Sequence, residues 1–381
     1  YSDNIKNILI TADKLIYHKN DEKIFTIGNS KVIEKNNNIS ANELEYDKNL
    51  NTFKAKKNAE IHDYNKDTKI YADEISYIKG EEKIYTKGKT RAIVQKKYKF
   101  NSSDIYYFRN DEDIFSENKA SIKDDSGNIY KLDSFSYNIT EGLLKGEKIE
   151  VLAKVEENKI DRYFFEDGFF NFKEKNHLAK KTKINIHKEV FGDKNNDPRI
   201  YSTSSSSDQS KTVFNNAIFT SCKFNDDCPP WSIKAEKIMH DKIKKDMIYK
   251  NAILKVYDVP VLYFPKFFHP DSTVERRSGF LQPRLNNSKT LGSSINIPYF
   301  KTLGSNKDLT FKPTFFEKFS KFEKEKYILQ TEFRKKEKNS SLIADFAFLR
   351  DYKSSTNSLS LIHISEPTRP RLISYAVFCL K

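Results

Sequence analysis

The chain is poor in the features that would place it in several familiar classes. Cysteine occurs three times in 381 residues, too rarely for a disulfide-rich scaffold. Cys222 and Cys228 have no suitable pair of histidines nearby, so we expect no zinc site. No apolar run approaches the ~18 residues that a transmembrane helix needs. The most apolar segment, Val259–Phe268, is shorter and holds two prolines, while membrane-barrel strands need only ~9–11 alternating residues.

Catalytic and cofactor-binding motifs are missing as well. The sequence has no G-x-S-x-G elbow, phosphate-binding loop, H-E-x-x-H motif or dinucleotide fingerprint. His240-Asp241 and His269-Pro270-Asp271 could suggest catalysis, but neither accompanies a nucleophile motif. We therefore expect a protein that is not an enzyme and that has no cofactor and no metal.

Charge and aromatic content favour sheet structure over nucleic-acid binding. The formal net charge is +14, but the lysines are spread along the chain rather than clustered, so we expect no nucleic-acid partner. The mean hydropathy of −0.73 is low, yet 13% of the residues are aromatic. Disordered chains lack aromatic residues, whereas strands with one apolar and one wet face use them. The composition therefore predicts an all-β protein.

One phrase recurs five times within residues 1–150. It has the pattern small-acidic-x-apolar-x-Tyr, and the closing tyrosines are spaced 29, 31, 30 and 30 residues apart. A second phrase follows about a dozen residues after each of the first four copies, and turn-forming clusters lie between the two phrases. Units of this length stack on one another and bury a shared face.

Period-two alternation predicts the members of that shared face. They are Leu15, Tyr17, Leu44, Tyr46, Ile75, Tyr77, Ile105, Tyr107, Phe135 and Tyr137. Charged residues such as Glu43 and Glu74 take the other face. Two interpretations fit the pattern: the face is the closed core of a spacer, or it lines a partly open groove in which acyl chains lie. Periodicity alone does not distinguish them.

The composition changes after residue 190. Residues 191–215 are polar, with a serine run at Ser204–Ser207, and predict a linker or insertion. Five phrases then follow in order: FTSC at 219–222, WSIKA at 231–235, IMHD at 238–241, VPVLYFP at 259–265 and RRSGFLQP at 276–283. In order and spacing they resemble the signature of the LptD (OstA/Imp) family of outer-membrane lipopolysaccharide-assembly proteins.

The resemblance implies a route for a lipid rather than a reaction. In this family, lipopolysaccharide arrives from an LptA-like periplasmic bridge that is joined by edge-strand augmentation. It passes through a β-jelly roll and leaves into the outer leaflet through a lateral gate in a barrel whose lumen holds an LptE-like lipoprotein plug. The resemblance thus implies lipopolysaccharide transport and insertion at the cell outer membrane, with the N-terminal domain in the periplasm.

The last third of the chain predicts strands of a second kind. Segments 279–285, 293–299, 309–315, 327–333 and 342–348 have strand length, and several alternate between apolar and polar residues. This alternation is typical of a membrane barrel, but a soluble meander with one wet face also allows it. With the resemblance, we interpret the segments as the first strands of a large outer-membrane β-barrel, too few to close it.

Two prolines and two cysteines are candidate functional residues here. Pro283 and Pro298 fall inside the first two predicted barrel strands, where proline breaks the ladder. The resemblance gives them the role of weakening closure at the lateral gate, and a simple rim bulge is the alternative. It also makes Cys222 a disulfide cysteine of the oxidising periplasm. Cys228 departs from the family pattern, so the two cysteines pair either with each other or with cysteines outside this sequence.

The final residues, Leu359–Lys381, look foreign. LSLIHISEPTR and ISYAVFCL resemble the in-frame translation of a sequencing-library adapter, so we expect no role for this tail and expect the natural protein to continue past Ser358. The sequence also starts at Tyr1 without an initiator methionine or signal peptide, which predicts a trimmed or incomplete N-terminus.

The predicted organisation has five parts. They are an OstA-type periplasmic β-jelly roll at 1–190, the polar linker or insertion at 191–215, the end of the jelly roll and its connection at 216–275, the first transmembrane barrel strands at 276–358, and the adapter-like tail at 359–381. The alternative for the whole chain is an LptA-like periplasmic bridge or a repeat-built structural or surface-binding protein.

Overall fold

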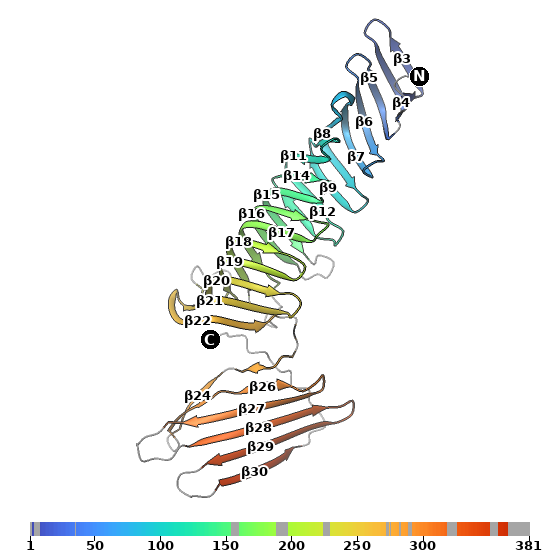
Figure 1. The fold of residues 1–381 in the computed structure, drawn as a ribbon. Coiled ribbons are helices and arrows are strands. Elements are labelled where there is room, and N and C mark those ends of the chain that lie inside the picture. The colour runs from blue at the N-terminus through green and yellow to red at the C-terminus, as the bar shows by residue number, and fades with distance from the viewer. Residues whose placement is uncertain are drawn as a thin grey trace. The chain divides into compact units, whose positions relative to one another are not determined.

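The computed structural model confirms an all-β fold. It describes residues 2–3, 8–34, 36–153, 160–187, 197–223, 229–271, 274, 276–281, 283–288, 292–317, 326–350 and 357–364. The chain divides into two compact units, residues 1–271 and residues 272–381 (Figure 1). Within the described ranges, no helix is long and apolar enough to cross a membrane.

The first unit is one hydrogen-bonded antiparallel sheet. Its strands are β1 (Ser2–Asp3), β2 (Ile8–Thr11), β3 (Lys14–His18), β4 (Lys23–Glu34), β5 (Asn37–Asp47), β6 (Thr52–Asp63), β7 (Thr68–Ile78), β8 (Lys83–Val94), β9 (Tyr98–Ser103), β10 (Tyr106–Phe108), β11 (Asp113–Ser116), β12 (Ala120–Lys123), β13 (Ile129–Leu132), β14 (Ser134–Asn138), β15 (Leu143–Ala153), β16 (Asp161–Asn171), β17 (Asn176–Asn185), β18 (Arg199–Ser207), β19 (Lys211–Thr220), β20 (Trp231–Asp241), β21 (Asp246–Val256) and β22 (Val259–Pro270). A single 3-10 turn, η1 (Lys79–Glu81), separates β7 from β8 in the described chain.

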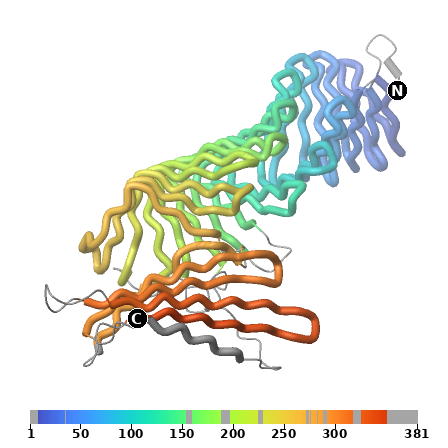
Figure 2. Tube along the Cα trace, turned by 60° about the horizontal axis from the view of Figure 1, so that its bottom comes forward, coloured from blue at the N-terminus to red at the C-terminus, as the bar shows by residue number. Residues whose placement is uncertain are grey.

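Each long strand near the N-terminus bends at its middle. The pairing register shifts between Ile27 and Ser30 in β4 and between Lys56 and Ala59 in β6. Irregularities of this kind bend a strand and increase its twist. Positive φ values mark these corners in alternate strands, at Gly28, Asn29, Lys57, Asn58, Gly88, Lys148, Lys181, Asn216 and Asn251. Farther along, β9 and β10 are the two halves of one such strand, and the bent strands stack along the unit (Figures 1 and 2).

The corners explain both phrases of the sequence repeat. The second phrase supplies the corner itself, and the acidic residue of the first phrase faces it. Asp13 Oδ2 accepts a hydrogen bond from Asn29 Nδ2 at 3.0 Å, and Asp104 Oδ1 accepts one from the Gly88 N–H at 2.8 Å. At other corners the acid meets a lysine, in the pairs Glu43–Lys57 and Asp133–Lys148, and Glu166–Lys181 forms the same contact beyond the five copies of the phrase. The repeat therefore encodes the two partners of one bend.

The space between the two halves of the bent sheet holds the core. One cluster of buried apolar side chains runs from Ile8 to Ala179, and a second runs from Ile184 to Ala252. Tyr163 packs against both clusters. Small buried residues such as Ala59 and Thr90 lie beside the corners, where the two halves of the sheet converge.

The predicted polar linker at 191–215 is wrong for its described part. Residues Arg199–Ser207 form β18, and β19 begins at Lys211, so the serine run lies inside the sheet. The hydroxyl groups of Thr182 and Ser205 lie 2.7 Å apart in the interior, which satisfies both. The polar composition wrongly indicated a linker, because serine and threonine can be buried in a sheet when their hydroxyl groups have hydrogen-bond partners. Residues 191–196 lie outside the described residues.

The second unit is a separate antiparallel sheet. Its strands are β23 (Gly279–Phe280), β24 (Arg284–Ser288), β25 (Gly292–Asn296), β26 (Tyr299–Thr302), β27 (Lys307–Phe316), β28 (Tyr327–Lys336), β29 (Ser341–Arg350) and β30 (Asn357–Ile364). From β26 to β30 each strand pairs with the next one in the chain. Strand β30 includes the first residues of the predicted adapter-like tail, and residues 365–381 lie outside the described part, so the origin of the tail stays a prediction.

Candidate functional site

The interior of the first unit contains eight of the ten residues predicted for the shared face. All eight are almost completely buried and belong to one cluster: Leu44, Tyr46, Ile75, Tyr77, Ile105, Tyr107, Phe135 and Tyr137. Their rings touch one another through intervening phenylalanines. Phe53 stacks on Tyr46 at a centroid distance of 4.3 Å and lies 6.1 Å from Tyr77. The alternation thus identified the inward-facing positions of four successive repeats.

Leu15 and Tyr17 are not brought into this cluster. They lie on β3, where every residue is exposed, and Tyr17 is 43% exposed. Among the described strands, β3 pairs with β4 alone, so no neighbouring repeat covers its inner side. The Tyr17 hydroxyl instead donates to Glu22 at 2.8 Å, and the Lys48 ammonium lies 5.5 Å from its ring.

Polar contacts close the first unit on the side opposite the corners. Because each strand bends back, the turns at its two ends approach each other there. We call this line of contacts the seam. Its pairs join residues 44 to 46 positions apart and are Asp63–Arg109, Asp63–Tyr107, Lys66–Glu112 and Gln95–Ile139. Lys79 and Glu34 form a further ion pair across it.

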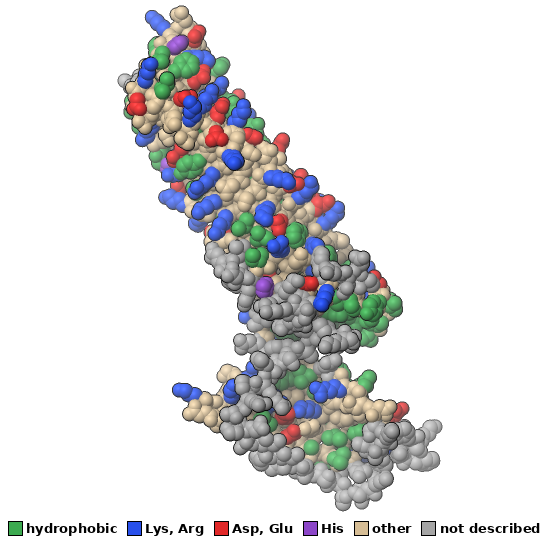
Figure 3. Space-filling view, turned by 180° about the vertical axis from the view of Figure 1, so that it is seen from behind, with side chains coloured by type: hydrophobic (Ala, Val, Ile, Leu, Met, Phe, Trp, Pro, Cys, Tyr) green, Lys and Arg blue, Asp and Glu red, His purple; other side chains and the backbone are tan. Residues whose placement is uncertain are grey.

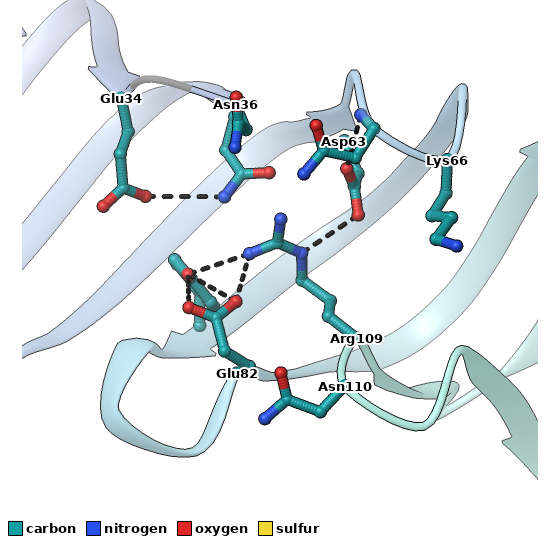
Figure 4. A pocket seen from close by; sticks show the side chains of 10 residues that line it. Glu34, Asn36, Asp63, Lys66, Glu82, Arg109 and Asn110 are labelled. Carbon is teal, nitrogen blue, oxygen red and sulfur yellow. Dashed lines mark hydrogen bonds and ion pairs between the residues drawn. The ribbon is translucent and has the colours of Figure 1, made fainter.

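Arg109 is the centre of the seam (Figure 4). Its Nε donates to Asp63 Oδ2 at 3.0 Å, its Nη1 donates to the Tyr77 hydroxyl at 3.1 Å, and it also pairs with Glu82. The Tyr107 hydroxyl donates to Asp63 at 2.9 Å. Two rings of the apolar interior thus present their hydroxyl groups to the same buried ion pair.

Electrostatics keep the two tyrosines and the arginine of this network in one protonation state. Burial raises the pKa of Tyr107, and the adjacent Asp63 carboxylate raises it further. Burial also raises the pKa of Tyr77, with Glu34 adding to the shift. Burial lowers the pKa of Arg109, but its hydrogen bond to Asp63 and the surrounding carboxylates outweigh burial, so the pKa is raised overall. The tyrosines therefore remain neutral donors and the arginine remains charged.

Pro283 and Pro298 interrupt two predicted strands of the second unit. Pro283 separates β23 from β24, and Pro298 separates β25 from β26, so each predicted strand is two strands. The two interruptions lie side by side, since the Leu281 N–H donates to the Pro298 carbonyl at 2.8 Å. The Ile297 N–H in turn donates to the carbonyl of Pro313 in β27 at 3.2 Å. Three prolines thus mark one level across neighbouring strands.

Cys222 lies just after β19, where it packs against the second apolar cluster and also makes polar contacts. Its Sγ is 3.7 Å from the Trp231 carbonyl, and its own carbonyl accepts a hydrogen bond from Arg199 Nη1 at 2.5 Å. Cys228 lies outside the described residues, so the disulfide prediction is not tested. Among the described residues, no group of three or more His, Cys, Asp or Glu side chains is placed to hold a metal ion.

Register in the second unit separates a polar face from an aromatic face. Thr310, Glu332 and Asp345 lie opposite one another across three strands and share one face. Glu332 pairs with Lys312 and Arg334, and Gln330 Nε2 donates to Asp345 at 2.7 Å. The other face carries Leu309, Phe311, Phe315, Tyr327, Leu329, Phe333, Ala344, Phe346 and Phe348. The alternation of apolar and polar residues in segments 309–315, 327–333 and 342–348 therefore corresponds to two faces of the sheet.

The surface of the first unit is mixed in charge along its length (Figure 3). Lysines and arginines alternate with acidic side chains, and this view shows no basic stripe of the kind that tracks a nucleic acid. Hydrophobic side chains gather at the C-terminal end of the unit (Figure 3). There, β22 exposes Val259, Val261, Leu262, Tyr263 and Phe268.

The seam residues were missed by sequence reasoning. Period-two alternation reports which way a strand residue points, but not which turn it meets after the strand bends. One signal was present: Arg91 and Arg109 are the only arginines in the first 150 residues, and lysine supplies every other cation there. A rare arginine two residues after the closing tyrosine of a repeat, as Arg109 is after Tyr107, fits a buried, forked ion pair better than a surface charge.

These features define a class: an all-β chain whose first unit is a bent, jelly-roll-like sheet around an apolar interior, followed by a sheet with one polar and one aromatic face. No protein-family model matches the chain. About a third of it is similar to the LPS-assembly protein LptD of several bacteria. The Shewanella oneidensis protein is 36% identical over 127 residues, which is 32% of this chain and 16% of that protein.

Other relatives give similar values. LptD of Legionella pneumophila (strain Paris) is 36% identical over 102 residues, covering 27% of this chain and 12% of that protein. LptD of Acidovorax sp. (strain JS42) is 33% identical over 110 residues, covering 28% and 13%. Each match thus spans about a sixth or less of the relative's length. Among solved structures, LptH, the LptA homologous periplasmic component of the lipopolysaccharide transport device of Pseudomonas aeruginosa, matches with a TM-score of 0.18 and 14% identity, over 36% of this chain and 80% of that one.

Proposed function

We propose that this chain conducts lipopolysaccharide through the interior of its first unit for insertion into the outer leaflet of the outer membrane. The observation that carries the proposal is the apolar cluster from Ile8 to Ala179, bounded on one side by a polar seam. Moving acyl chains from water into an apolar lining lowers the free energy, whereas a charged headgroup needs water or polar partners. The identity of 33–36% with LptD over about a third of the chain supports lipopolysaccharide as the lipid.

Lipid entry requires the interior to open. The eight buried residues of the shared face, from Leu44 to Tyr137, fill the space between the two halves of the sheet. Of these, Tyr46 and Tyr77 are at most 1% exposed. An acyl chain therefore enters by separating the two sides of the seam and displacing aromatic side chains from their mutual contacts. Replacing contacts between aromatic side chains by contacts with an acyl chain costs little free energy. The free energy of opening therefore comes mainly from breaking the polar contacts of the seam.

The second unit supplies the membrane end of the route. Its aromatic face is suited to lipid contact, and its polar face is suited to a water-filled lumen, as in the first strands of an outer-membrane β-barrel. The interruptions at Pro283 and Pro298 weaken backbone pairing at one level, which suits a lateral gate through which lipid leaves. Cys222 and Cys228 are assigned to disulfides of the oxidising periplasm.

Two protein partners follow from the same arrangement. Strand β3 pairs with β4 alone among the described strands, which leaves a free edge for augmentation by an LptA-like periplasmic bridge. The polar face of the second unit, with Glu332, Lys312 and Asp345, is suited to contact an LptE-like lipoprotein plug. The first unit then lies in the periplasm and the second in the outer membrane. Residues 1–271 form the jelly roll in this assignment.

Photocrosslinking of the purified chain tests the route. A benzophenone amino acid replaces Tyr46, Tyr77 or Tyr107 in turn, and each variant is illuminated with lipopolysaccharide. We expect a crosslinked lipid band at all three positions. The control is the same amino acid at Glu45, which neighbours Tyr46 in the strand but faces outward and pairs with Lys23. Equal labelling at Glu45 and Tyr46, or none at the tyrosines, contradicts an interior path.

An LptA-like bridge or a repeat-built structural protein is the second candidate, favoured by the tight packing of the interior. If the chain is a purely structural spacer, no lipid crosslink forms at Tyr46, Tyr77 or Tyr107. A soluble bridge predicts crosslinks in the first unit and no association of the second unit with lipid bilayers. The same crosslinking series, followed by flotation of the chain with liposomes, separates these outcomes.

A further inference from the structure

A polar hollow lies on the seam beside the buried arginine (Figure 4). Its volume is about 380 Å³, at the small end of the roughly 300–1,000 Å³ that ligand pockets span. Turns from both edges of the bent sheet supply its lining, which comprises Glu34, Asn36, Asn37, Asp63, Asn65, Lys66, Tyr77, Glu82, Arg109 and Asn110. The hollow therefore exists only because the seam brings the two edges together.

One side chain in this lining has an unmet hydrogen-bonding need. Asn37 is 3% exposed, and its Oδ1 has no donor among the described residues. Its Nδ2 reaches Glu34 at 3.4 Å, so the amide is held with its oxygen free. Buried acceptors almost always have a partner. A donor from outside the protein is thus expected at this position.

The lining chemistry selects the class of donor. Glu34, Asp63 and Glu82 disfavour a bound anion, and Arg109 and Lys66 disfavour a bound metal cation. Nine of the ten lining residues are charged or amide side chains, which disfavours an apolar ligand. A sugar hydroxyl offers one donor and two acceptor sites, so a ring with several hydroxyls can satisfy carboxylates, amides and a guanidinium together.

The hollow also meets the apolar interior at Tyr77, which lines it, and through Tyr107, which binds the lining residue Asp63. The rings of Tyr77 and Tyr107 belong to the buried cluster, while their hydroxyls bind Arg109 and Asp63 at the seam. A molecule with an apolar part inside and a polar part at the seam would therefore contact the ring of Tyr77 with one part and its hydroxyl side with the other. That is the shape of a glycolipid.

We propose that the hollow is a saccharide subsite, in which Asn37 accepts a hydrogen bond from a hydroxyl of one sugar ring of the lipid whose acyl chains occupy the interior. The proposal rests on the lipid-conducting function proposed above. It adds a site on the seam that binds the headgroup, while the apolar interior holds the acyl chains.

The test uses the full chain and the oligosaccharide obtained by removing every acyl chain from a rough-type lipopolysaccharide. Isothermal titration calorimetry of this glycan is expected to show binding that Asn37→Ala weakens about tenfold, the loss of roughly one buried hydrogen bond. Asn110→Ala, an exposed residue of the same lining, is expected to weaken binding several-fold without affecting folding. The matched control is Asn20→Ala, an exposed turn asparagine outside the hollow. Inorganic phosphate is expected not to compete.

The outcomes separate the subsite from the function. If the acylated lipid crosslinks at Tyr77 but the glycan does not bind, or binds both asparagine variants as tightly as the unchanged chain, the subsite is wrong and the lipid route stands. Competition by phosphate overturns the assignment to a sugar. If neither lipid nor glycan associates, both proposals fail. Far-UV circular dichroism of Asn37→Ala checks folding, and Asn110→Ala decides the question if that variant is unfolded.

Discussion

The Nε of Arg109 lies 3.0 Å from Oδ2 of Asp63, a residue 46 positions earlier in the chain. With a repeat of about 30 residues, this pair joins one repeat to the second repeat beyond it rather than to its neighbour. Stacked repeats usually interact only with adjacent units. The seam therefore couples the N-terminal repeats more widely than the sheet ladder does, and opening it at one point disturbs three repeats together.

Removing one partner of this pair is expected to destabilise the chain strongly. Arg109→Met leaves the Asp63 carboxylate buried without its cation, at a cost of about 3–5 kcal/mol in the free energy of unfolding. Urea denaturation of Arg109→Met, Asp63→Asn and the double variant measures the coupling, and we expect the double variant to lose much less than the sum of the two. Lys57→Met breaks the exposed pair with Glu43 and serves as the control, with an expected loss below about 1 kcal/mol. Additive losses at Arg109 and Asp63 contradict the coupling.

Equivalent tyrosines of different repeats are expected to differ sharply in their contribution. Tyr46→Ala empties a buried site stacked on Phe53 and should cost about 3–5 kcal/mol, as for other large aromatic residues. Tyr17→Ala alters the same position of the phrase where it is exposed, and should stay within about 0.5 kcal/mol. Chemical denaturation of both variants compares them directly. Similar losses at the two sites show that β3 is covered in solution.

The corner glycines should resist substitution by alanine. Gly28 has φ +76°, and a Cβ there would lie 2.3 Å from Asp13 Oδ2. The left-handed conformation alone costs an L-residue about 1–2 kcal/mol, so Gly28→Ala is expected to lose at least that much. Gly80→Ala is the matched control, because a Cβ at Gly80 meets nothing within 4 Å. Thermal or urea unfolding of the two variants gives the comparison, and equal midpoints argue against a strained corner.

Local pattern predicted much of the first unit because its interior is built from one repeated alternation. The tyrosine spacing identified the inward positions from Leu44 to Tyr137, which the structure buries. It could not identify Leu15 and Tyr17 as exposed, since exposure depends on whether a neighbouring repeat covers β3. The serine run at Ser204–Ser207 was misjudged for the same reason, because hydroxyl groups acquire interior partners only through pairing with β17 and β19.

The seam lay beyond sequence reasoning for a geometrical reason. Arginine is rare in this part of the sequence, but nothing there joins Arg109 to Asp63, and only the bend of each strand brings their two edges together. In the second unit, by contrast, alternation was sufficient: Phe311 and Lys312 take opposite faces as the sequence indicates, because a nearly straight strand needs no long-range information.

Acid should destabilise the first unit through His177. Burial beside Phe165 and Phe170, together with the smaller effect of the Lys242 charge, lowers the pKa of His177 to about 4. Between about pH 6.5 and 4 the unfolded chain binds the proton and the folded chain does not, so stability falls as the pH falls through this window. The shift corresponds to at most about 3 kcal/mol. Urea midpoints at pH 7.5 and 5.0 should differ less for His177→Phe than for the unchanged chain, and an equal difference contradicts this origin.

Adjacent residues of β29 should report opposite environments when the chain is reconstituted in liposomes. Phe346 lies on the aromatic face and Asp345 on the polar face of the second unit. A single cysteine is introduced at either position after the native cysteines are changed to serine, and it is labelled with an environment-sensitive fluorophore. If the aromatic face meets lipid, brominated acyl chains quench the label at Phe346, and aqueous iodide quenches the label at Asp345. Phe346→Arg should then reduce liposome association, since a charge facing the bilayer midplane costs about 2–4 kcal/mol, whereas Asp345→Asn should not. Iodide quenching at both positions identifies a soluble meander and removes the membrane role of the second unit.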